Sequence, residues 1–294
     1  MALGIPGIED AMASSRDRYW LDTNSHASAR LNLQHFWNQL SCGYLIHPDI
    51  PVATNAKVAD VGTGTGLWPI SLSTTLPPSV QLHGFDISDA QFPPKNWLPE
   101  NVNMDTWNAL NPAPEHLIGQ YDVVNIRYFG LVVRKDNFDG LLRNLVSLLK
   151  PGGFLQWTEI NIPEQEILSG QPGSPATATS AFSEDGMETI ATLGVNFDWL
   201  RNLPEIFHDF GLTGARQFRP KPLAALRPMS SYLAIGGWEE FSYNVLDKRG
   251  PHPILGTGQE LRQRLHEVRK EIQAGAAIEQ LHYVTVGRHP AEEA

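Results

Sequence analysis

Three glycines at alternating positions follow an apolar run that ends in an acid in "VADVGTGTGL", residues 58–67. Asp60 is the acid near the end of the apolar run. Gly62, Gly64 and Gly66 follow it and precede "LWPISLS", a stretch that favours a helix. A glycine-rich turn between a strand and a helix lets a ligand touch the backbone, and its free N–H groups favour negative charge. The motif therefore predicts a ligand whose anionic end is held by main-chain amides.

The dinucleotide fingerprint G-x-G-x-x-G is the first alternative for this turn. It requires a third glycine at position 67, where the sequence has Leu67, and the pattern present is D-x-G-x-G-x-G. Asp86 ends the next predicted strand, 20 residues past Gly66. Its carboxylate suits both ribose hydroxyls of a nucleoside. An NAD enzyme would offer the same acid, so Asp86 alone does not decide between the two classes.

The chain around the motif alternates predicted strands and helices, which implies a parallel, doubly wound α/β sheet. Apolar runs predict five strands, over residues 57–62, 80–88, 102–107, 121–129 and 154–161. Two more strands are expected over 213–222 and 281–290, and helices within 15–46 and over 137–149, 182–194, 198–212, 223–247 and 257–276. Residues 260–272 are charged on most faces, so we expect a solvated helix there that can contact a partner subunit.

The D-x-G-x-G-x-G spacing resembles the first motif of the class I S-adenosylmethionine-dependent methyltransferases. The resemblance covers residues 57–160, with Asp86 and "LLKPGGFLQWTEI" in the family's order. It implies a Rossmann-like, doubly wound seven-stranded sheet whose last strand is antiparallel, with N-terminal helices and a helical insertion before the last strand. It also implies S-adenosyl-L-methionine as the cofactor and no metal.

The same resemblance implies a single methyltransferase domain over residues 1–294. Its expected parts are an N-terminal helical cap over 1–50, a cofactor-binding core over 57–160, and a C-terminal half over 161–294. The C-terminal half is expected to carry a helical insertion that forms the acceptor pocket.

Carried over residue by residue, the resemblance assigns cofactor contacts near the carboxyl ends of the first four strands. These are Asp60, Gly62, Thr63, Gly64, Gly66, Asp86, Ile87, Trp107, Asn108, Asn125 and Arg127. The adenine amino group has two candidate acceptors. Asp105 is the acid nearest the third strand, but "NALNPAPEHLIGQYDVV" resembles a family stretch that puts Asn108 at the acid's place. We prefer Asn108, because its carbonyl accepts the same bond.

His35 is the candidate catalytic base. It lies on the helical segment before the motif, which in this fold tends to cover the cofactor, and an unperturbed pKa near 6.5 suits proton removal. A packed or solvated histidine without function is the alternative. Arg30 on the same segment either pairs with the cofactor carboxylate or lies along the surface. Methyl transfer from a sulfonium depends mainly on positioning and exclusion of water.

Further stretches narrow the resemblance: "ARLNLQH", "LHGFDIS" with "FPP" behind it, and "LLKPGGFLQWTEIN". They resemble the fungal secondary-metabolism methyltransferases, the group related to the gliotoxin-pathway N-methyltransferase and the velvet-associated regulator. This implies methyl transfer to oxygen or nitrogen of a small natural product. Two alternatives stay open: a cofactor-binding, methyltransferase-like protein that acts as a cyclase or regulator, and an NAD-dependent oxidoreductase.

Composition and charge bound the partners. The 294 residues carry a net charge of −10, without a cluster of Lys and Arg to follow phosphates, which argues against nucleic acid. No run approaches the roughly 18 apolar residues of a membrane span, and the N-terminus lacks the pattern of a secretory signal. Cys42 is the only cysteine, so an intrachain disulfide is excluded. We expect a cytoplasmic monomer or homodimer that binds a small-molecule substrate.

Overall fold

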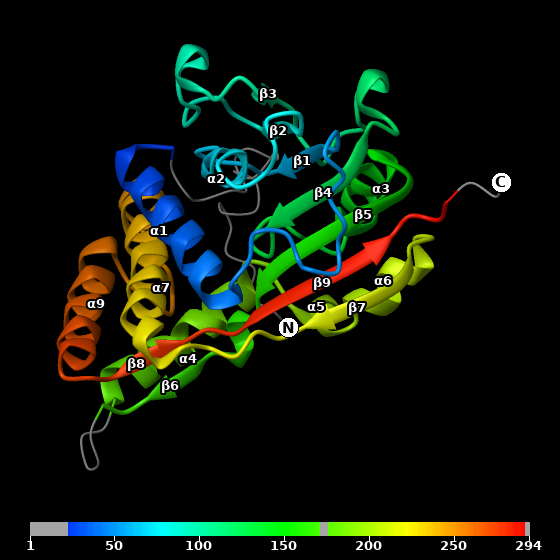
Figure 1. The fold of residues 1–294 in the computed structure, drawn as a ribbon. Helices are drawn as coiled ribbons and strands as arrows, with labels where there is room; N and C mark the ends of the chain where they lie inside the picture. The colour runs from blue at the N-terminus through cyan, green and yellow to red at the C-terminus, as the bar shows by residue number, and fades with distance from the viewer. Residues whose placement is uncertain (1–22, 171–175, 292–294) are drawn as a thin grey trace. The chain divides into compact units, whose positions relative to one another are not determined.

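The computed structural model describes residues 23–170 and 176–291 (Figure 1). Within them the chain divides into two units. The sheet unit comprises Leu31–Glu164, Asn196–Leu226 and the residues from Gln280 onward. The helical unit comprises the residues up to Arg30, Gln165–Val195 and Arg227–Glu279. The expected helical cap over residues 1–50 lies partly outside the described residues.

Seven strands of the sheet unit form one sheet in the order β3-β2-β1-β4-β5-β9-β7. Their bounds are Lys57–Val61 (β1), Gln81–Asp86 (β2), Val102–Thr106 (β3), Tyr121–Arg127 (β4), Leu149–Ile160 (β5), Thr213–Phe218 (β7) and His282–Arg288 (β9). Strands β1 to β5 pair in parallel, whereas β9 runs antiparallel to both β5 and β7. The predicted fold class, the seven predicted strands and the antiparallel last strand are confirmed.

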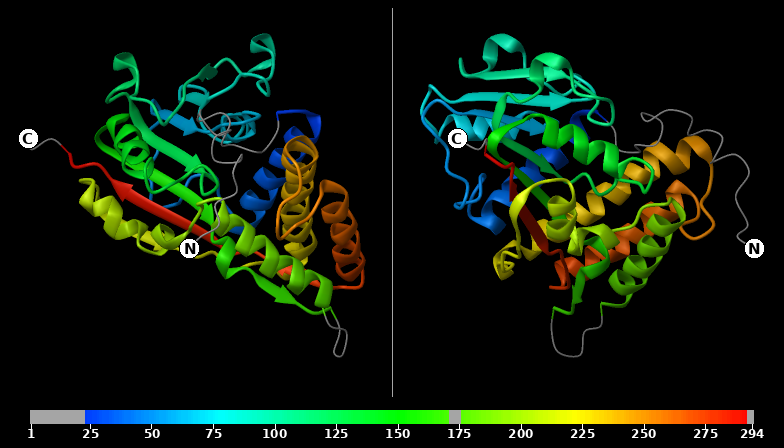
Figure 2. Two further views of the ribbon diagram at one scale, coloured as in Figure 1. Left: turned by 180° about the vertical axis from the view of Figure 1, so that it is seen from behind. Right: turned by 90° about the vertical axis from the view of Figure 1, so that its right-hand side faces the viewer.

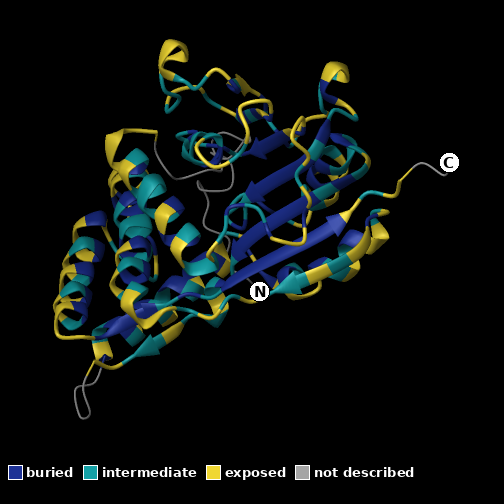
Figure 3. Ribbon diagram, viewed as in Figure 1, coloured by how far each residue is buried: buried dark blue, intermediate teal, exposed yellow. Residues whose placement is uncertain are grey.

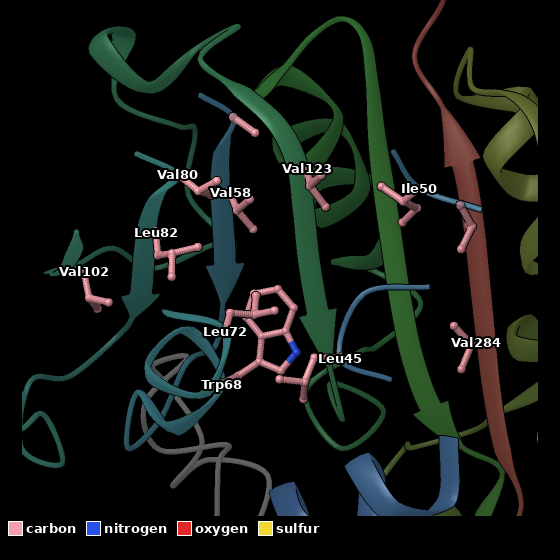
Figure 4. Close-up of a cluster of buried hydrophobic side chains, with 12 residues drawn as sticks. Leu45, Ile50, Val58, Trp68, Leu72, Val80, Leu82, Val102, Val123 and Val284 are labelled. Atoms are coloured by element: carbon pink, nitrogen blue, oxygen red, sulfur yellow. The ribbon is translucent and has the colours of Figure 1, made fainter. Parts of the chain in front are cut away.

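One face of the sheet is covered by α2 (Leu67–Ser73) and by the segment that follows α1 (Ser25–Cys42). Because side chains alternate along a strand, each strand gives this face every second residue. Figure 4 shows the resulting cluster, in which the buried residues include Leu45, Ile50, Val58, Trp68, Leu72, Val80, Leu82, Val102, Val123 and Val284. This packing fixes α2, and with it the glycine turn, on the strands.

The opposite face is covered by α3 (Phe138–Ser147), α5 (Asp198–Arg201) and α6 (Leu203–Asp209), as Figure 2 shows. The rings of Phe138, Trp157 and Trp199 join α3, β5 and α5, with centroids 5.2–6.0 Å apart. Helices on both faces leave most residues of the central strands buried (Figure 3), as expected for a doubly wound sheet.

The helical unit surrounds its own core. Its elements are α4 (Thr177–Thr192), α7 (Arg227–Phe241), α8 (Asp247–Arg249), α9 (Gly258–Gln273) and an antiparallel pair, β6 (Glu166–Leu168) with β8 (Ala277–Glu279). A π-helical turn, Ser242–Leu246, joins α7 to α8.

Short 3-10 turns occur in the rest of the described chain, at Lys95–Trp97, Glu115–Leu117, Ile162–Glu164 and Ala224–Leu226. None of the helices described is long and apolar enough to cross a bilayer.

The prediction of a solvated helix over residues 260–272 is wrong for one face of α9. Leu261, Leu265, Val268 and Ile272 are buried there. Their spacing of four, three and four residues makes a narrow apolar stripe between charged positions. The many charged residues of this stretch obscure the apolar stripe when composition is considered without the helical spacing of the residues.

Candidate functional site

The glycine turn joins β1 to α2 at the carboxyl edge of the sheet, as the sequence predicts. Gly62, Gly64 and Gly66 have φ values of +72°, +57° and +72°, in the left-handed region that L side chains disfavour. The N–H groups of Gly62 and Thr63 both donate to the Phe85 carbonyl in β2, each at 2.8 Å. The turn is therefore tied to the strand that carries Asp86.

The glycines differ in what surrounds them. A methyl group on Gly62 would stand 2.2 Å from Phe129 Cε2, because that aromatic ring rests on the first glycine. Among the described residues, a methyl group on Gly64 would meet Leu31 Cδ1 alone, at 3.2 Å. Gly62 therefore makes room for the protein's own side chain, whereas the backbone of Gly64 has the more open surroundings.

Asp86 faces the glycine turn from the end of β2. Its Oδ2 accepts the Gly64 N–H at 2.8 Å, and its Oδ1 accepts the Ser88 N–H at 3.4 Å. Burial raises the pKa of Asp86, and these backbone hydrogen bonds oppose the rise. The next residue, Ile87, keeps 44% of its surface exposed. The end of β2 thus offers a carboxylate beside an exposed apolar side chain.

A row of polar side chains crosses three strands behind the turn. Asp60, Asn125 and Gln156 are register neighbours in β1, β4 and β5, and all three are buried. Asn125 Nδ2 donates to Asp60 Oδ1 at 2.7 Å, and Gln156 Nε2 donates to Asn125 Oδ1 at 2.9 Å. Gln156 also accepts the His47 N–H at 2.7 Å and donates to the Leu45 carbonyl at 2.9 Å. The row therefore fixes the segment after α1 to the sheet.

Arg127 and His35 meet beside this row. Arg127 Nη1 lies 3.5 Å from His35 Nδ1, and His35 Nε2 lies 3.0 Å from Ser71 Oγ. Arginine only donates, so Nδ1 is the acceptor and the proton of the neutral ring is on Nε2, which donates to Ser71. The buried Nε of Arg127 has no hydrogen-bond partner among the described residues. The Nε–H of Arg127 is thus a donor without an acceptor among the described residues, close to the glycine turn.

The surroundings of His35 correct the expectation that its pKa lies near 6.5. Burial and, second, the charge of Arg127 lower the pKa to about 3. The ring is neutral at pH 7, and its acceptor nitrogen already faces a guanidinium. These surroundings favour a hydrogen-bonding and positioning role over proton removal.

The end of β3 separates the two candidates for the adenine contact. Asp105 Oδ2 lies 2.8 Å from His83 Nε2, so this carboxylate already has a partner. Asn108 Oδ1 accepts the Leu110 N–H at 3.1 Å in a local turn. Trp107, between them, is buried, and its main-chain N–H donates to the Asp86 carbonyl at 2.8 Å. The assignment of Asn108 and Trp107 as cofactor contacts stays a prediction. Asp105 forms a hydrogen bond with His83 instead.

Arg30 belongs to the helical unit, in an ion pair. Its Nε lies 2.6 Å from Glu240 Oε1, and both side chains are nearly buried. The sequence left open whether Arg30 pairs with the cofactor carboxylate or lies along the surface. In the structure its guanidinium is nearly buried and pairs with Glu240.

Sequence reasoning missed two buried polar residues of β5, Gln156 and Glu159. Glu159 Oε2 accepts the Gly130 N–H at 2.8 Å, and Oε1 accepts the Ile160 N–H at 3.1 Å. Burial raises the pKa of this carboxyl to about 7, against the effect of its backbone hydrogen bonds. The available signal was a glutamine and a glutamate inside "FLQWTEI", a strand that is otherwise apolar at the centre of the sheet.

The raised pKa of Glu159 makes stability depend on pH. A carboxyl whose pKa rises on folding, from 4.5 to about 7, contributes stability that is complete below pH 4.5 and is lost as pH rises through about 7. We expect the free energy of unfolding of the native protein, relative to Glu159→Gln, to fall by about 2–3 kcal/mol between pH 4.5 and pH 8. Urea denaturation of both proteins across this range measures it. A constant difference between the two would contradict the assignment.

Comparisons with known proteins find similarity over the part of the chain that carries this site. Residues 59–155 match the family model described as a methyltransferase domain. The chain is 38% identical over 161 residues to methyltransferase grgD from a Penicillium species, covering 51% of this chain and 56% of that protein. It is 30% identical over 149 residues to N-methyltransferase verN from Clonostachys rogersoniana, covering 50% of this chain and 52% of that protein. The matches thus span little more than half the length of these curated relatives.

Among solved structures, phosphoethanolamine N-methyltransferase 2 of Haemonchus contortus, in complex with phosphomonomethylethanolamine and S-adenosylhomocysteine, aligns with a TM-score of 0.53 at 15% identity. The alignment covers 95% of this chain and 61% of that chain. At this identity the likeness concerns the fold. The resemblance predicted from the sequence is confirmed: residues 59–155 match the methyltransferase-domain model, and about half of the chain is similar to fungal secondary-metabolism methyltransferases.

Proposed function

We propose that the protein is an S-adenosyl-L-methionine-dependent methyltransferase that transfers a methyl group to oxygen or nitrogen of a small secondary metabolite. The observation that carries the proposal is the pairing of the glycine turn with Asp86, whose carboxylate accepts the Gly64 N–H at 2.8 Å. The homology of residues 59–155 to methyltransferase domains supports it. N-methyltransferase verN, one of the relatives, gives nitrogen as one acceptor class to test.

The residues around the turn fit this cofactor. Asp86 offers a carboxylate for paired ribose hydroxyls, and Ile87 offers an exposed apolar side chain for an adenine face. The unsatisfied Nε of Arg127 suits the carboxylate of an amino-acid tail, since guanidinium and carboxylate form strong charge-assisted bonds. Gly64 has no side chain that would block a ligand beside its Cα. Thr63, Gly62 and Gly66 complete the proposed binding set as parts of the turn.

The cofactor, when bound, supplies an electrophilic methyl group on a good leaving group, so the protein's task is to orient the reactants and exclude water. Arg127 and Asp86 are suited to orient the two polar ends of the ligand. His35, neutral and bonded to Ser71, holds Arg127 by its Nδ1 side. We therefore propose His35 as a residue that positions Arg127.

Binding of S-adenosylhomocysteine tests the proposed function directly. We expect calorimetry to detect S-adenosylhomocysteine but not NAD, and Asp86→Ala to weaken the affinity by about 1.5–3 kcal/mol, through loss of hydrogen bonds to a charged acceptor. Asp86→Asn keeps an acceptor for the Gly64 N–H and serves as the control. Binding of NAD in preference would sink the proposal. Mass spectrometry of extracts incubated with isotopically labelled S-adenosylmethionine then identifies the acceptor.

Alanine substitutions at two glycines separate fold from ligand binding. Both residues have positive φ, which costs an L residue roughly 1–2 kcal/mol. We expect Gly64→Ala to lose about that much stability while its affinity for S-adenosylhomocysteine falls at least roughly tenfold, because the methyl group narrows the ligand's approach to the backbone. Gly62→Ala must also displace the Phe129 ring, so it should be the less stable variant. Equal affinity in native protein and Gly64→Ala would remove this backbone from the site.

The pH dependence of turnover tests the role of His35. A ring with a pKa of about 3 does not titrate between pH 6 and pH 9. We therefore expect His35→Asn to turn over more slowly than the native enzyme, because Arg127 loses its neighbour, while the shape of the pH–rate profile stays the same. Disappearance of an inflection between pH 6 and pH 9 in the variant would restore the histidine as the base.

A further inference from the structure

Three consecutive residues after β4 are each held by a different element. The Tyr128 hydroxyl and His282 Nε2 in β9 share a hydrogen bond of 2.9 Å. The Phe129 ring rests on Gly62 of the glycine turn. The Gly130 N–H donates to Glu159 Oε2 in β5 at 2.8 Å. The segment Tyr128–Gly130 therefore connects the turn with β5 and β9, and none of these three anchors was needed for the ligand contacts proposed above.

The backbone of this segment is in a conformation that needs support. Tyr128 has φ +57°, the only positive φ outside glycine in the described residues. A non-glycine residue in the left-handed region is strained, and such a conformation persists only where the surroundings hold it. Tyr128 is followed directly by the ring that covers Gly62, so relaxation of this strain would move Phe129.

Glu159 is one of the anchors that resist such a relaxation, beside the hydrogen bonds of Tyr128 to His282 and to the Thr158 carbonyl. The side chain is 2% exposed, and its two oxygens accept the N–H groups of Gly130 and Ile160. A methyl group on Gly130 would lie 2.4 Å from Phe197 Cε1 and 3.3 Å from Glu159 Cδ, so both side chains pack closely against this backbone. The hydrogen bond and the close packing together restrain Gly130.

Glu159 lies on a different face of the sheet from the polar row. Side chains alternate along β5, so Gln156 supports the face that carries Asp60 and Asn125, and Glu159 supports the loop on the face of Trp157. The proposed ligand site is therefore held from two sides by one strand. On each face, β5 contributes one of these buried polar side chains.

We propose that Glu159 is a positioning residue of the methyltransferase site, which fixes Phe129 against Gly62 and so gives the glycine turn its binding-competent shape. This inference rests on the proposed function for the identity of the ligand. The conformational part concerns only contacts within the chain, and it has a measurement of its own.

The test uses the full-length protein and three variants. Glu159→Ala removes both acceptors, whereas Glu159→Gln keeps one carbonyl for the Gly130 N–H. Glu271→Ala is the matched control: this carboxylate accepts the N–H groups of Ala178 and Thr179 at 2.9 and 2.8 Å, within the helical unit. Hydrogen–deuterium exchange reports on the peptide that contains residues 128–130, and calorimetry reports the affinity for S-adenosylhomocysteine.

We expect Glu159→Ala to speed exchange in that peptide at least tenfold and to weaken S-adenosylhomocysteine binding at least tenfold. Glu159→Gln should restore both to within threefold of the native protein, and Glu271→Ala should leave both unchanged. The inference is overturned if Glu159→Ala exchanges and binds as the native protein does, or if Glu271→Ala weakens binding equally. If the native protein binds no S-adenosylhomocysteine, the proposed function fails, and the exchange data still decide whether Glu159 holds the segment.

Discussion

The hydrogen-bonded row of Asp60, Asn125 and Gln156 is the constraint on which the candidate site depends. It joins three neighbouring strands through buried side chains, where a missing partner would leave a desolvated polar group. Because every member needs the next, the row admits one register of β1, β4 and β5. The carboxyl ends of these strands are thereby brought to one level, and the glycine turn follows directly from the first of them.

Hydrophobic packing alone would not define this edge as sharply. The cluster around Trp68 and Leu72 holds α2 on the sheet, but apolar contacts tolerate small shifts that hydrogen bonds do not. The N–H groups of Gly62 and Thr63, both directed at the Phe85 carbonyl, add the same kind of directional contact between β1 and β2. The apolar core thus supplies most of the stability, and a few polar contacts determine where the turn lies.

The parts of the site that could be predicted from the sequence are those with a short-range signature. The glycine spacing from Gly62 to Gly66 and the acid at Asp86 depend on neighbours within one supersecondary unit. The pKa of His35 could not be predicted, since it depends first on burial by the tertiary fold and second on Arg127, 92 positions further along the chain. Likewise the contact of Glu159 with the Gly130 N–H could not be predicted, because it forms only when β4 and β5 are paired.

The fold was accessible for a related physical reason. Strands at the centre of a parallel sheet are buried on both faces and therefore appear as continuous apolar runs, which locates them without knowledge of their partners. The buried face of a helix such as α9 can be predicted only from the spacing of a few apolar residues among many charged ones. The charged residues between Leu261 and Leu265 suggested an exposed helix instead. Strands as short as β6 and β8 have too few residues for an alternating pattern to be recognised in the sequence.

Burial moves the titratable groups of the sheet unit toward their neutral forms. It raises the pKa of Asp60 and of Glu159, the latter to about 7, and it lowers the pKa of His35 and His282 to about 3. Under the proposed function this suits the chemistry, because a sulfonium donor carries its own positive charge and its leaving group needs no proton. A site of this kind gains from fixed dipoles and neutral hydrogen-bonding groups, whose orientation the fold has already set, more than from an ionisable residue that must change its charge during the reaction.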